Sequence, residues 1–467
     1  MRLAAALSGL ILAAGLSLFT IPIRAQTNED LSGCYQESNP DLAITYCTGM
    51  IDSGQFPASN LAIAFTNRGN AYNSKGEYDR AVQDFEQAVR LNPTYAYAFN
   101  GLGNAHNGEG DYDHAIQDYD QAIRLIPSYG YAFNGRGNAY NSKGDHDRAI
   151  QDYDHAIQFT PNYANAFNGR GNAYSSKGEY DRAIQDYDQA IRFNPNHAYA
   201  FNGRGNAYNS KGEYDRAIQD FNQAIRCTPN YANAFNGRGN AYNDKGDYDR
   251  AIEDYDQAIR LNPNYADAFF NRGNAYNSKS EYDRAVQDYD QAVLLSPNFA
   301  NAFFNRGFTR FKQGSIAAAV PDFAKSAELL PADRYSILWL YVASARAGQN
   351  ADAALGHAQK LDLVSWPGPV LSLFLKKTDR EALVEAAKDP DAQKERDRLC
   401  EVHFFLAENE LLEGVQKKAD ADFQEAAETC RPTFVEYSAA TSELKRLPLP
   451  PPSSVGVARQ LDVGSPK

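Results

Sequence analysis

The sequence predicts an all-α fold built from repeated helical hairpins. Shifting the 467-residue chain by 34 residues superimposes a Phe, a Gly and a Pro in eight consecutive units. Each unit holds two segments whose apolar residues recur at helical spacing, which is typical of amphipathic helices. The composition is biased accordingly, with 30 Tyr and 33 Gly but 2 Met and 2 Trp, and such bias accompanies internal repetition.

Residues 198–231 illustrate how one unit is organised. Phe201, Gly205 and Tyr208 form the expected buried stripe of a first helix. Gly212 then ends this helix, because glycine adopts the left-handed conformation of a helix C-terminus at little cost. The second helix is expected to begin near Glu213 and to stop before Pro229, which has no amide hydrogen to donate.

These residues resemble the signature of the tetratricopeptide repeat (TPR) family. The aromatic, Gly, Tyr, Ala, aromatic and Pro positions of that signature are occupied by Phe201, Gly205, Tyr208, Ala217, Phe221 and Pro229. The resemblance implies a right-handed superhelix, or α-solenoid, of eight 34-residue helix-turn-helix repeats whose first helices line the inner, concave side. It also implies a protein that binds a protein or an extended peptide and is not an enzyme.

Both ends of the chain depart from the repeat, as capping units must, because a terminal repeat covers an apolar face on one side only. The first residues combine Arg2, an apolar run and a small residue at Ala25, which indicates a signal peptide; an uncleaved membrane anchor is the alternative. The expected segments are a signal peptide at 1–25, an N-terminal capping hairpin at 26–61, eight repeats at 62–333, a C-terminal helical cap at 334–446 with a degenerate TPR-like hairpin at 400–433, and a disordered Pro-rich tail at 447–467.

The cysteines favour two disulfides, since an exported chain reaches an oxidising compartment. Cys34 and Cys47 flank a turn, while Cys400 and Cys430 are expected to open and close the two helices of the C-terminal hairpin. An N-terminal cap with such a Cys pair resembles exported bacterial TPR proteins, so a periplasmic or secreted location is expected. Cys227 stands where other units carry Leu or Phe, and we expect a buried thiol there.

One departure from the family signature is systematic, because arginine replaces its leucine in seven units and only Leu102 conforms. The arginines are Arg68, Arg136, Arg170, Arg204, Arg238, Arg272 and Arg306. A guanidinium at such a position needs a partner, so we expect pairing with Asp residues of the second helices. The alternative is a ladder that grips carboxylates of a bound chain.

Two rows of asparagine recur on the first helices and are the candidate binding residues. The first row is Asn70, Asn104, Asn138, Asn172, Asn206, Asn240 and Asn274, and the second is Asn100, Asn134, Asn168, Asn202 and Asn236. Each amide offers an acceptor and a donor, the complement of a peptide group, so the rows predict a grip on an extended backbone. They resemble the asparagine ladder of the O-linked N-acetylglucosamine transferases, whose catalytic domain has no counterpart here. Solvation of a polar surface is the alternative.

Other chemistry is disfavoured by the composition. The net charge of −13 argues against a nucleic-acid partner. The seven histidines show no metal-site or nucleophile spacing, so no cofactor, metal or catalytic residue is expected. The tyrosines that follow the unit-ending prolines are expected to pack between units. The sequence therefore predicts a scaffold or adaptor of the bacterial cell envelope; the alternative is an enzyme whose active site lies in 334–446 and whose repeats present the substrate.

Overall fold

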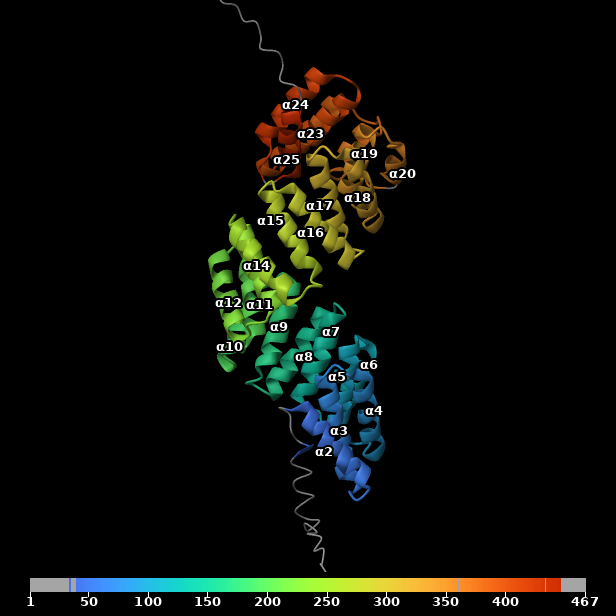
Figure 1. Cartoon of the computed structure of the whole chain (residues 1–467), viewed down its shortest axis with the longest axis vertical. Helices are drawn as coiled ribbons and strands as arrows, with labels where there is room; N and C mark the ends of the chain where they lie inside the picture. Colours follow the sequence, from blue (N-terminus) through green and yellow to red (C-terminus); the bar gives the residue numbers. More distant parts are fainter. Residues whose placement is uncertain (1–32, 35–38, 359–360, 433, 447–467) are drawn as a thin grey trace, which may run out of the picture. The chain divides into compact units, whose positions relative to one another are not determined.

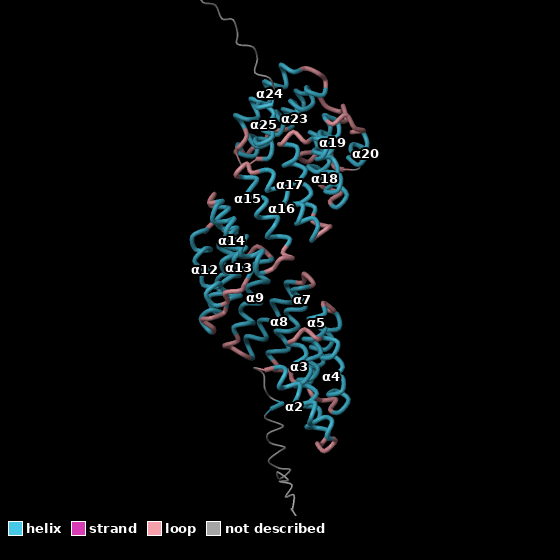
Figure 2. Tube along the Cα trace, in the orientation of Figure 1, coloured by secondary structure: helices cyan, strands magenta, loops and turns pink. Residues whose placement is uncertain are grey.

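The computed structural model describes residues 33–34, 39–358, 361–432 and 434–446. All regular structure in these residues is helical (Figure 2). They form two compact units that divide between Pro229 and Asn230, and each unit is described by itself. The expected signal peptide or anchor at 1–25 and the expected tail at 447–467 lie outside the described residues, as does part of the expected N-terminal hairpin. Within the described residues, no helix combines the length and apolar character needed to cross a bilayer.

The first unit contains an N-terminal capping helix and five helical hairpins, which stack in chain order (Figure 1). Its helices are α2 (Pro40–Ser53), α3 (Ala58–Ser74), α4 (Tyr78–Leu91), α5 (Ala96–Glu109), α6 (Tyr112–Leu125), α7 (Gly130–Ser142), α8 (His146–Phe159), α9 (Ala164–Ser176), α10 (Tyr180–Phe193), α11 (Ala198–Ser210) and α12 (Tyr214–Cys227). Each hairpin from α3 onward is one repeat, and its odd-numbered helix is the first helix of that repeat.

The second unit contains the remaining three repeats and the C-terminal cap. The repeats are α13 (Ala232–Asp244) with α14 (Tyr248–Leu261), α15 (Ala266–Ser278) with α16 (Tyr282–Leu295), and α17 (Ala300–Lys312) with α18 (Ile316–Leu329). The cap comprises α19 (Arg334–Arg346), α20 (Asp352–Ala358), α21 (Gly368–Phe374), α22 (Arg380–Ala386), α23 (Ala392–Leu412), α24 (Gln416–Thr429) and α25 (Val435–Arg446). The all-α, eight-repeat solenoid class with atypical ends is therefore confirmed.

The local rules that predicted the hairpins hold in the repeat of α11 and α12. Phe201, Gly205 and Tyr208 are buried, and Gly212 has a φ of 76° in the turn between the helices. That φ is one that residues with a Cβ rarely adopt, which explains why the turn contains glycine. The second helix ends at Cys227, two residues before Pro229.

Neighbouring repeats interlock through an aromatic ring that lies against two glycines. Tyr153 of α8 is 1% exposed, and a Cβ added at Gly137 of the same repeat would lie 2.9 Å from its ring. A Cβ added at Gly169 of the next repeat would lie 2.5 Å from the same ring. These distances are too short for any real Cβ contact, so glycine is what allows the helices to approach.

The cap has a single apolar core around Trp339 of α19, which is fully buried. Phe308 and Phe311 of α17 lie 5.1 and 5.2 Å from the Trp339 ring, and Phe404 of α23 lies 5.2 Å from it. The prediction for the hairpin at 400–433 was partly wrong. Helix α23 begins at Ala392, because Asp391 accepts hydrogen bonds from the amides that follow it, so Cys400 lies inside the helix and does not open it.

Candidate functional site

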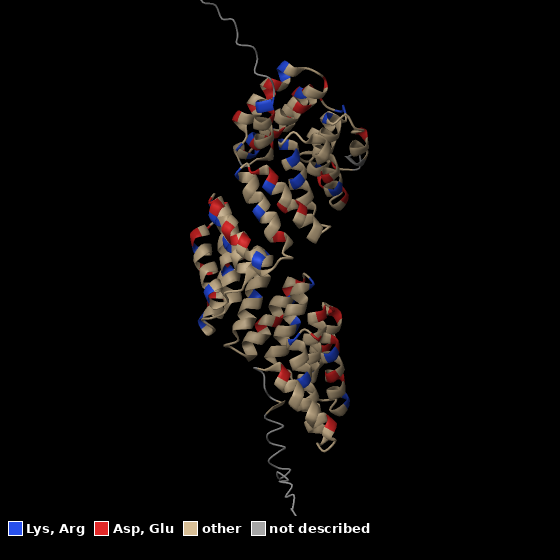
Figure 3. Cartoon of the chain, in the orientation of Figure 1, with Lys and Arg blue, Asp and Glu red and all other residues tan. Residues whose placement is uncertain are grey.

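The first row of asparagines lies on the exposed side of the first helices. Asn70, Asn104, Asn138, Asn172 and Asn206 are exposed in the first unit, whereas Asn240 and Asn274 are half-buried in the second. We call the asparagine rows of a unit, each unit taken by itself, its amide face. Lys, Arg, Asp and Glu are scattered along the helices of each unit (Figure 3).

Tyrosines of the second helices hold the first-row amides in one orientation. The hydroxyl of Tyr153 donates to Oδ1 of Asn138 at 2.7 Å, and that of Tyr187 donates to Oδ1 of Asn172 at 2.8 Å. The same bond, at 2.8 Å, joins Tyr119 to Asn104, Tyr255 to Asn240 and Tyr289 to Asn274. One lone pair of Oδ1 is therefore used within the protein in these five residues, and Nδ2 is the group left entirely for a ligand.

Two repeats lack this orienting bond, because phenylalanine replaces tyrosine. Phe85 occupies the place of Tyr153 in the repeat of Asn70, and Phe221 occupies it in the repeat of Asn206. Both rings are fully buried as the tyrosines are. The first row thus contains asparagines with an orienting tyrosine and asparagines without one.

The second row is more deeply placed than the first. Asn134 and Asn236 are buried, and Asn100, Asn168 and Asn202 are half-buried. Within the described residues, Oδ1 has no hydrogen-bond partner in Asn100, Asn134, Asn168 and Asn202. Asn236 differs, because its Oδ1 accepts from Nδ2 of Asn271 at 3.1 Å. The second row therefore lies deeper than the first and keeps four acceptor oxygens without a partner in the described residues.

A third row was missed by sequence reasoning. It lies three residues after the first row, one helical turn further on, and its members are Asn73, Asn107, Asn141, Asn209, Asn243 and Asn277. The period of 34 and the i, i+3 spacing were sufficient to find it. Asn141 and Asn277 already have partners: Asn141 pairs with His146, and Asn277 accepts from Lys312 at 2.7 Å.

The arginines that replace the family leucine are paired inside the protein. Arg170 donates from Nε and Nη2 to both oxygens of Asp186 in its own repeat, at 2.8 and 2.7 Å. Its Nη1 donates at 2.5 Å to Asp154 of the preceding repeat. The own-repeat pairs are Arg68–Asp84, Arg136–Asp152, Arg170–Asp186, Arg204–Asp220, Arg238–Asp254, Arg272–Asp288 and Arg306–Asp322. The pairing expected from the sequence is present, and these guanidinium groups are committed to internal carboxylates.

Burial and pairing have opposite effects on the pKa values of each arginine–aspartate pair. Burial raises the pKa of the Asp186 carboxyl although the hydrogen bonds and charge of Arg170 lower it. Burial lowers the pKa of Arg170, but its bonds to Asp186 and Asp154 outweigh that effect and raise it. Opposed contributions of this kind leave a small net stabilisation, while removal of one partner strands a buried charge. The arginines therefore tie adjacent repeats together in a defined register.

The second repeat has a different partner for the carboxylate of its second helix. It carries Leu102 in place of arginine and His106 in place of tyrosine, and its buried-side carboxylate Asp118 lies 2.7 Å from Nδ1 of His106. In this repeat a histidine is therefore the partner of the carboxylate that an arginine contacts in the other repeats.

An aromatic strip borders the amide face in the first unit. Tyr97 and Tyr131, which are 51% and 53% exposed, alternate with Tyr95, Tyr129 and Tyr163. Ring centroids are 5.3 Å apart for Tyr97 and Tyr129 and 4.8 Å apart for Tyr131 and Tyr163. The tyrosines after the prolines do pack against a neighbouring repeat, as expected. The exposed Tyr97 and Tyr131 beside them were not predicted.

The amide face ends at the eighth repeat, where the cap covers the first helix. Phe304, Phe308 and Phe311 of α17 occupy the second-, first- and third-row positions. Helix α25 packs on α17, and Arg446 donates to the carbonyls of Phe311 and Lys312 at 3.0 and 3.1 Å.

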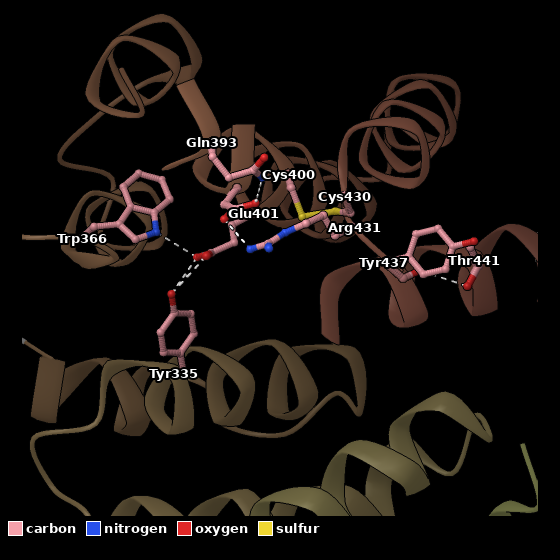
Figure 4. Close-up of a disulfide and its surroundings, with 10 residues drawn as sticks. Tyr335, Trp366, Gln393, Cys400, Glu401, Cys430, Arg431, Tyr437 and Thr441 are labelled. Carbon is pink, nitrogen blue, oxygen red and sulfur yellow. Dashed lines mark hydrogen bonds and ion pairs between the residues drawn. A yellow bond between two sulfur atoms is a disulfide. The ribbon is translucent and has the colours of Figure 1, made fainter. Parts of the chain in front are cut away.

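The cysteines lie as two close pairs and one single thiol. Cys34 and Cys47 form one disulfide, and Cys400 and Cys430 form the other (Figure 4 shows the second). The Cα atoms are 4.8 Å apart in both. Cys227 is half-buried at the end of α12, so the expectation of a buried thiol is wrong. Its last-turn position faces solvent on one side, and the corresponding Phe193 and Leu261 are also partly exposed.

Stacked helical hairpins with repeated polar residues on their first helices define a repeat protein of the interaction-scaffold class. Models of the tetratricopeptide repeat match residues 69–108, 137–178, 239–279 and 273–314, and further such models match 168–232, 96–129 and 221–253. Together these matches extend over 69–129 and 137–314, just over half of the chain. The chain belongs to the tetratricopeptide repeat family, whose repeats serve as protein-interaction scaffolds.

Solved structures show similarity to parts of this chain. A tetratricopeptide repeat protein from Parabacteroides merdae is 22% identical, with a TM-score of 0.44 over 53% of this chain and 98% of that one. YrrB, described as a TPR protein with an unusual peptide-binding site, is 24% identical, with a TM-score of 0.32 over 40% and 96%. PilF of Pseudomonas aeruginosa is 19% identical, with a TM-score of 0.39 over 44% and 94%. The search of curated proteins gave no significant match.

Proposed function

We propose that the amide face binds an extended segment of a partner protein and that its Nδ2 groups donate to backbone carbonyls of that segment. The observation that carries this proposal is the set of tyrosine-to-asparagine bonds, which occupy Oδ1 and leave Nδ2 as the available group. An amide held in place loses less rotational freedom on binding than a mobile one. One such Nδ2 donor recurs in each repeat, every 34 residues, and an extended segment likewise presents backbone carbonyls at regular intervals.

The experiment selects binding peptides and then asks which backbone groups they use. A library of random dodecapeptides is screened on the full chain, and the affinity of a selected peptide is measured by fluorescence polarisation. Changing Asn104, Asn138 and Asn172 together to Ala should weaken binding by at least roughly tenfold, on the order of a hydrogen bond for each residue. The matched control is Asn162→Ala, because Asn162 is exposed in a turn outside the amide face.

Backbone N-methylation of the selected peptide tests the direction of the hydrogen bonds. It removes N–H donors and keeps every carbonyl, so binding should survive it if the protein donates. A peptide that binds only with its N–H groups intact, or a triple variant that binds as the wild type does, contradicts the proposal.

We further propose that this scaffold works in the bacterial cell envelope, either in the periplasm or as a secreted protein. Two disulfides and the apolar N-terminal sequence support that location. Fractionation of cells producing the full chain, followed by thiol labelling with and without reductant, tests it. Recovery in the cytoplasm with all five cysteines reactive would overturn this part.

A further inference from the structure

The second unit contains a pocket of about 550 Å³ where α17, α18, α19, α23 and α25 meet. Three aromatic and three acidic side chains take part in its walls, and among its described lining residues there is no Lys, Arg or His. These six residues are Phe304, Tyr335, Phe434, Asp333, Glu401 and Glu436, and we call the cavity the acidic pocket.

Neutral groups donate hydrogen bonds to two of the three carboxylates. The side chain of Glu401 points between Tyr335 and Trp366 (Figure 4), and it accepts from the hydroxyl of Tyr335 at 3.0 Å and from Nε1 of Trp366 at 3.0 Å. Asp333 caps α19 by accepting from the amide of Ser336 at 2.9 Å. Neither bond supplies a positive charge.

The carboxylate of Glu436 is the exception that points to a ligand. Glu436 is 2% exposed, and within the described residues its Oε1 has no hydrogen-bond partner. A buried carboxylate with one oxygen left without a hydrogen-bond donor is costly, so it either keeps its proton or receives a cation. Burial, followed by the charge of Glu401, raises the pKa of Glu436. Burial likewise raises the pKa of Glu401.

The groups that face Glu436 do not supply that cation. They are Glu401 on α23, Tyr335 on α19 and Asp333 at the start of α19, while α17 and α18 contribute only uncharged residues. Two arginines lie nearby and are paired with other carboxylates: Arg398, whose charge acts on Glu401, pairs with Asp389 at 3.0 Å, and Arg431, whose guanidinium lies 4.8 Å from the centre of the Phe434 ring, pairs with Asp397 at 2.6 Å. No group of three or more His, Cys, Asp or Glu among the described residues is arranged to hold a metal ion. Among cations, an organic one is therefore the chemistry that this lining fits.

We propose that the acidic pocket binds the ammonium or guanidinium group of a Lys or Arg side chain presented by a bound polypeptide. Aromatic walls suit both the apolar stem and the cationic end of such a side chain. Asn301 and Phe304, which also line the pocket, occupy the α17 positions that Tyr199 and Asn202 occupy in α11. The acidic pocket therefore opens on the same side of a first helix as the amide face, and the choice of a polypeptide rests on the proposed function.

Small cations test the pocket without any peptide in the amide face. Titration calorimetry of the full chain with agmatine and with butylamine should show binding, and 1-butanol should not bind. Glu436→Gln should weaken binding of both amines by at least roughly tenfold, the order of a lost charge-assisted contact. Glu408→Gln is the matched control, because Glu408 is equally buried in the cap but does not line the pocket. Binding should strengthen as the pH rises and should release a proton, seen as a dependence of the enthalpy on the buffer.

A second variant keeps the proposal testable if Glu436→Gln folds poorly. Asn301→Lys should place a tethered ammonium at the pocket, raise the melting temperature at alkaline pH and abolish agmatine binding. If the wild type binds neither amine and Asn301→Lys does not stabilise the protein, the proposal that the acidic pocket binds a cation is wrong.

The affinities of two peptides then show whether the cation comes from a polypeptide side chain or from a small amine. A selected peptide with Lys should bind at least roughly tenfold more tightly than its norleucine analogue, and only when Glu436 is present. If amines bind but the two peptides do not differ, a small amine is the ligand and the polypeptide part is wrong. The amide-face variants should not change agmatine binding, so failure of the proposed function and failure of the pocket give different results.

Discussion

The first helices α9 and α17 have the same length and the same register but opposite surfaces. Asn168 and Asn172 of α9 occupy the positions that Phe304 and Phe308 occupy in α17. Asn172 is exposed, whereas Phe308 is buried against Trp339 of the cap. Amides that stay hydrated resist burial, while aromatic rings gain roughly 25 cal/mol for each Å² removed from water. A few side chains thus decide whether a repeat offers a surface to a ligand or joins the core.

The inner repeats and the C-terminal cap are also stabilised by different interactions. Inner repeats are joined by arginine–aspartate pairs and by aromatic rings against glycine, which both demand defined geometry. The cap relies on a cluster of large apolar side chains around Trp339 and leaves several buried acids unpaired at one oxygen. The four predictions below test this contrast.

The largest effect is expected for Trp339→Ala in the cap core. Removal of a fully buried indole leaves a cavity and should cost about 3–5 kcal/mol of unfolding free energy. Chemical denaturation followed by Trp366 fluorescence and circular dichroism measures it. Because the arginine–aspartate pairs of the first unit are distant in sequence and do not touch Trp339, we expect the cap to unfold at lower denaturant than the repeats. A single transition shifted as a whole would show that the two regions are energetically one.

Arg170→Leu restores the family residue but should destabilise the first unit by about 3 kcal/mol, because it leaves the buried Asp186 without its cation. Adding Tyr174→His copies the second repeat, where Leu102 and His106 coexist with Asp118. The double variant should recover part of the loss. Thermal melts of the wild type, the single and the double variant decide this, and a harmless single variant would refute the structural role of the pairs.

The cap should become less stable as the pH rises, by up to about 3 kcal/mol for a single buried acid. Burial raises the pKa of Glu408 to about 7, against an ordinary value of 4.5, despite its bond to Arg346. The folded state therefore binds the proton more tightly than the unfolded state. Stability from this group is complete below pH 4.5 and is lost as the pH rises through 7.

Denaturation at a series of pH values measures this dependence, and Glu408→Gln should flatten it. Stability that rises over the same pH range in the wild type would have the wrong sign and would contradict the assignment.

The smallest effect is expected for Gly169→Ala, at about 1–3 kcal/mol, since its Cβ would lie 2.5 Å from the Tyr153 ring. Gly49→Ala is the control, because a Cβ there would meet nothing within 4 Å and alanine favours the helix. Melting temperatures should fall for the first variant and stay or rise for the second. Equal behaviour of the two would mean that the glycine contact is not what sets the spacing of the repeats.

Sequence reasoning reached the helical hairpins, their period and the arginine partners because all of these depend on residues within one repeat length. It misplaced the start of α23, whose N-cap Asp391 lies in a stretch with no periodic signal. It found two of the three asparagine rows but not the direction in which the amides point. That direction depends on whether the second helix, 15 residues later, carries tyrosine or phenylalanine.

The sequence by itself determined the period, the ends of the helices in the repeats and the choice of cysteines to be paired, since helical propensity, glycine turns and proline stops act over a few residues. Only the tertiary structure decided that Tyr153 and Tyr187 orient Asn138 and Asn172, that the cap covers α17, and that Glu401 and Glu436 share a pocket. Glu401 and Glu436 lie on different helices, and their shared burial arises only when the helices pack. No local pattern specifies those contacts in advance.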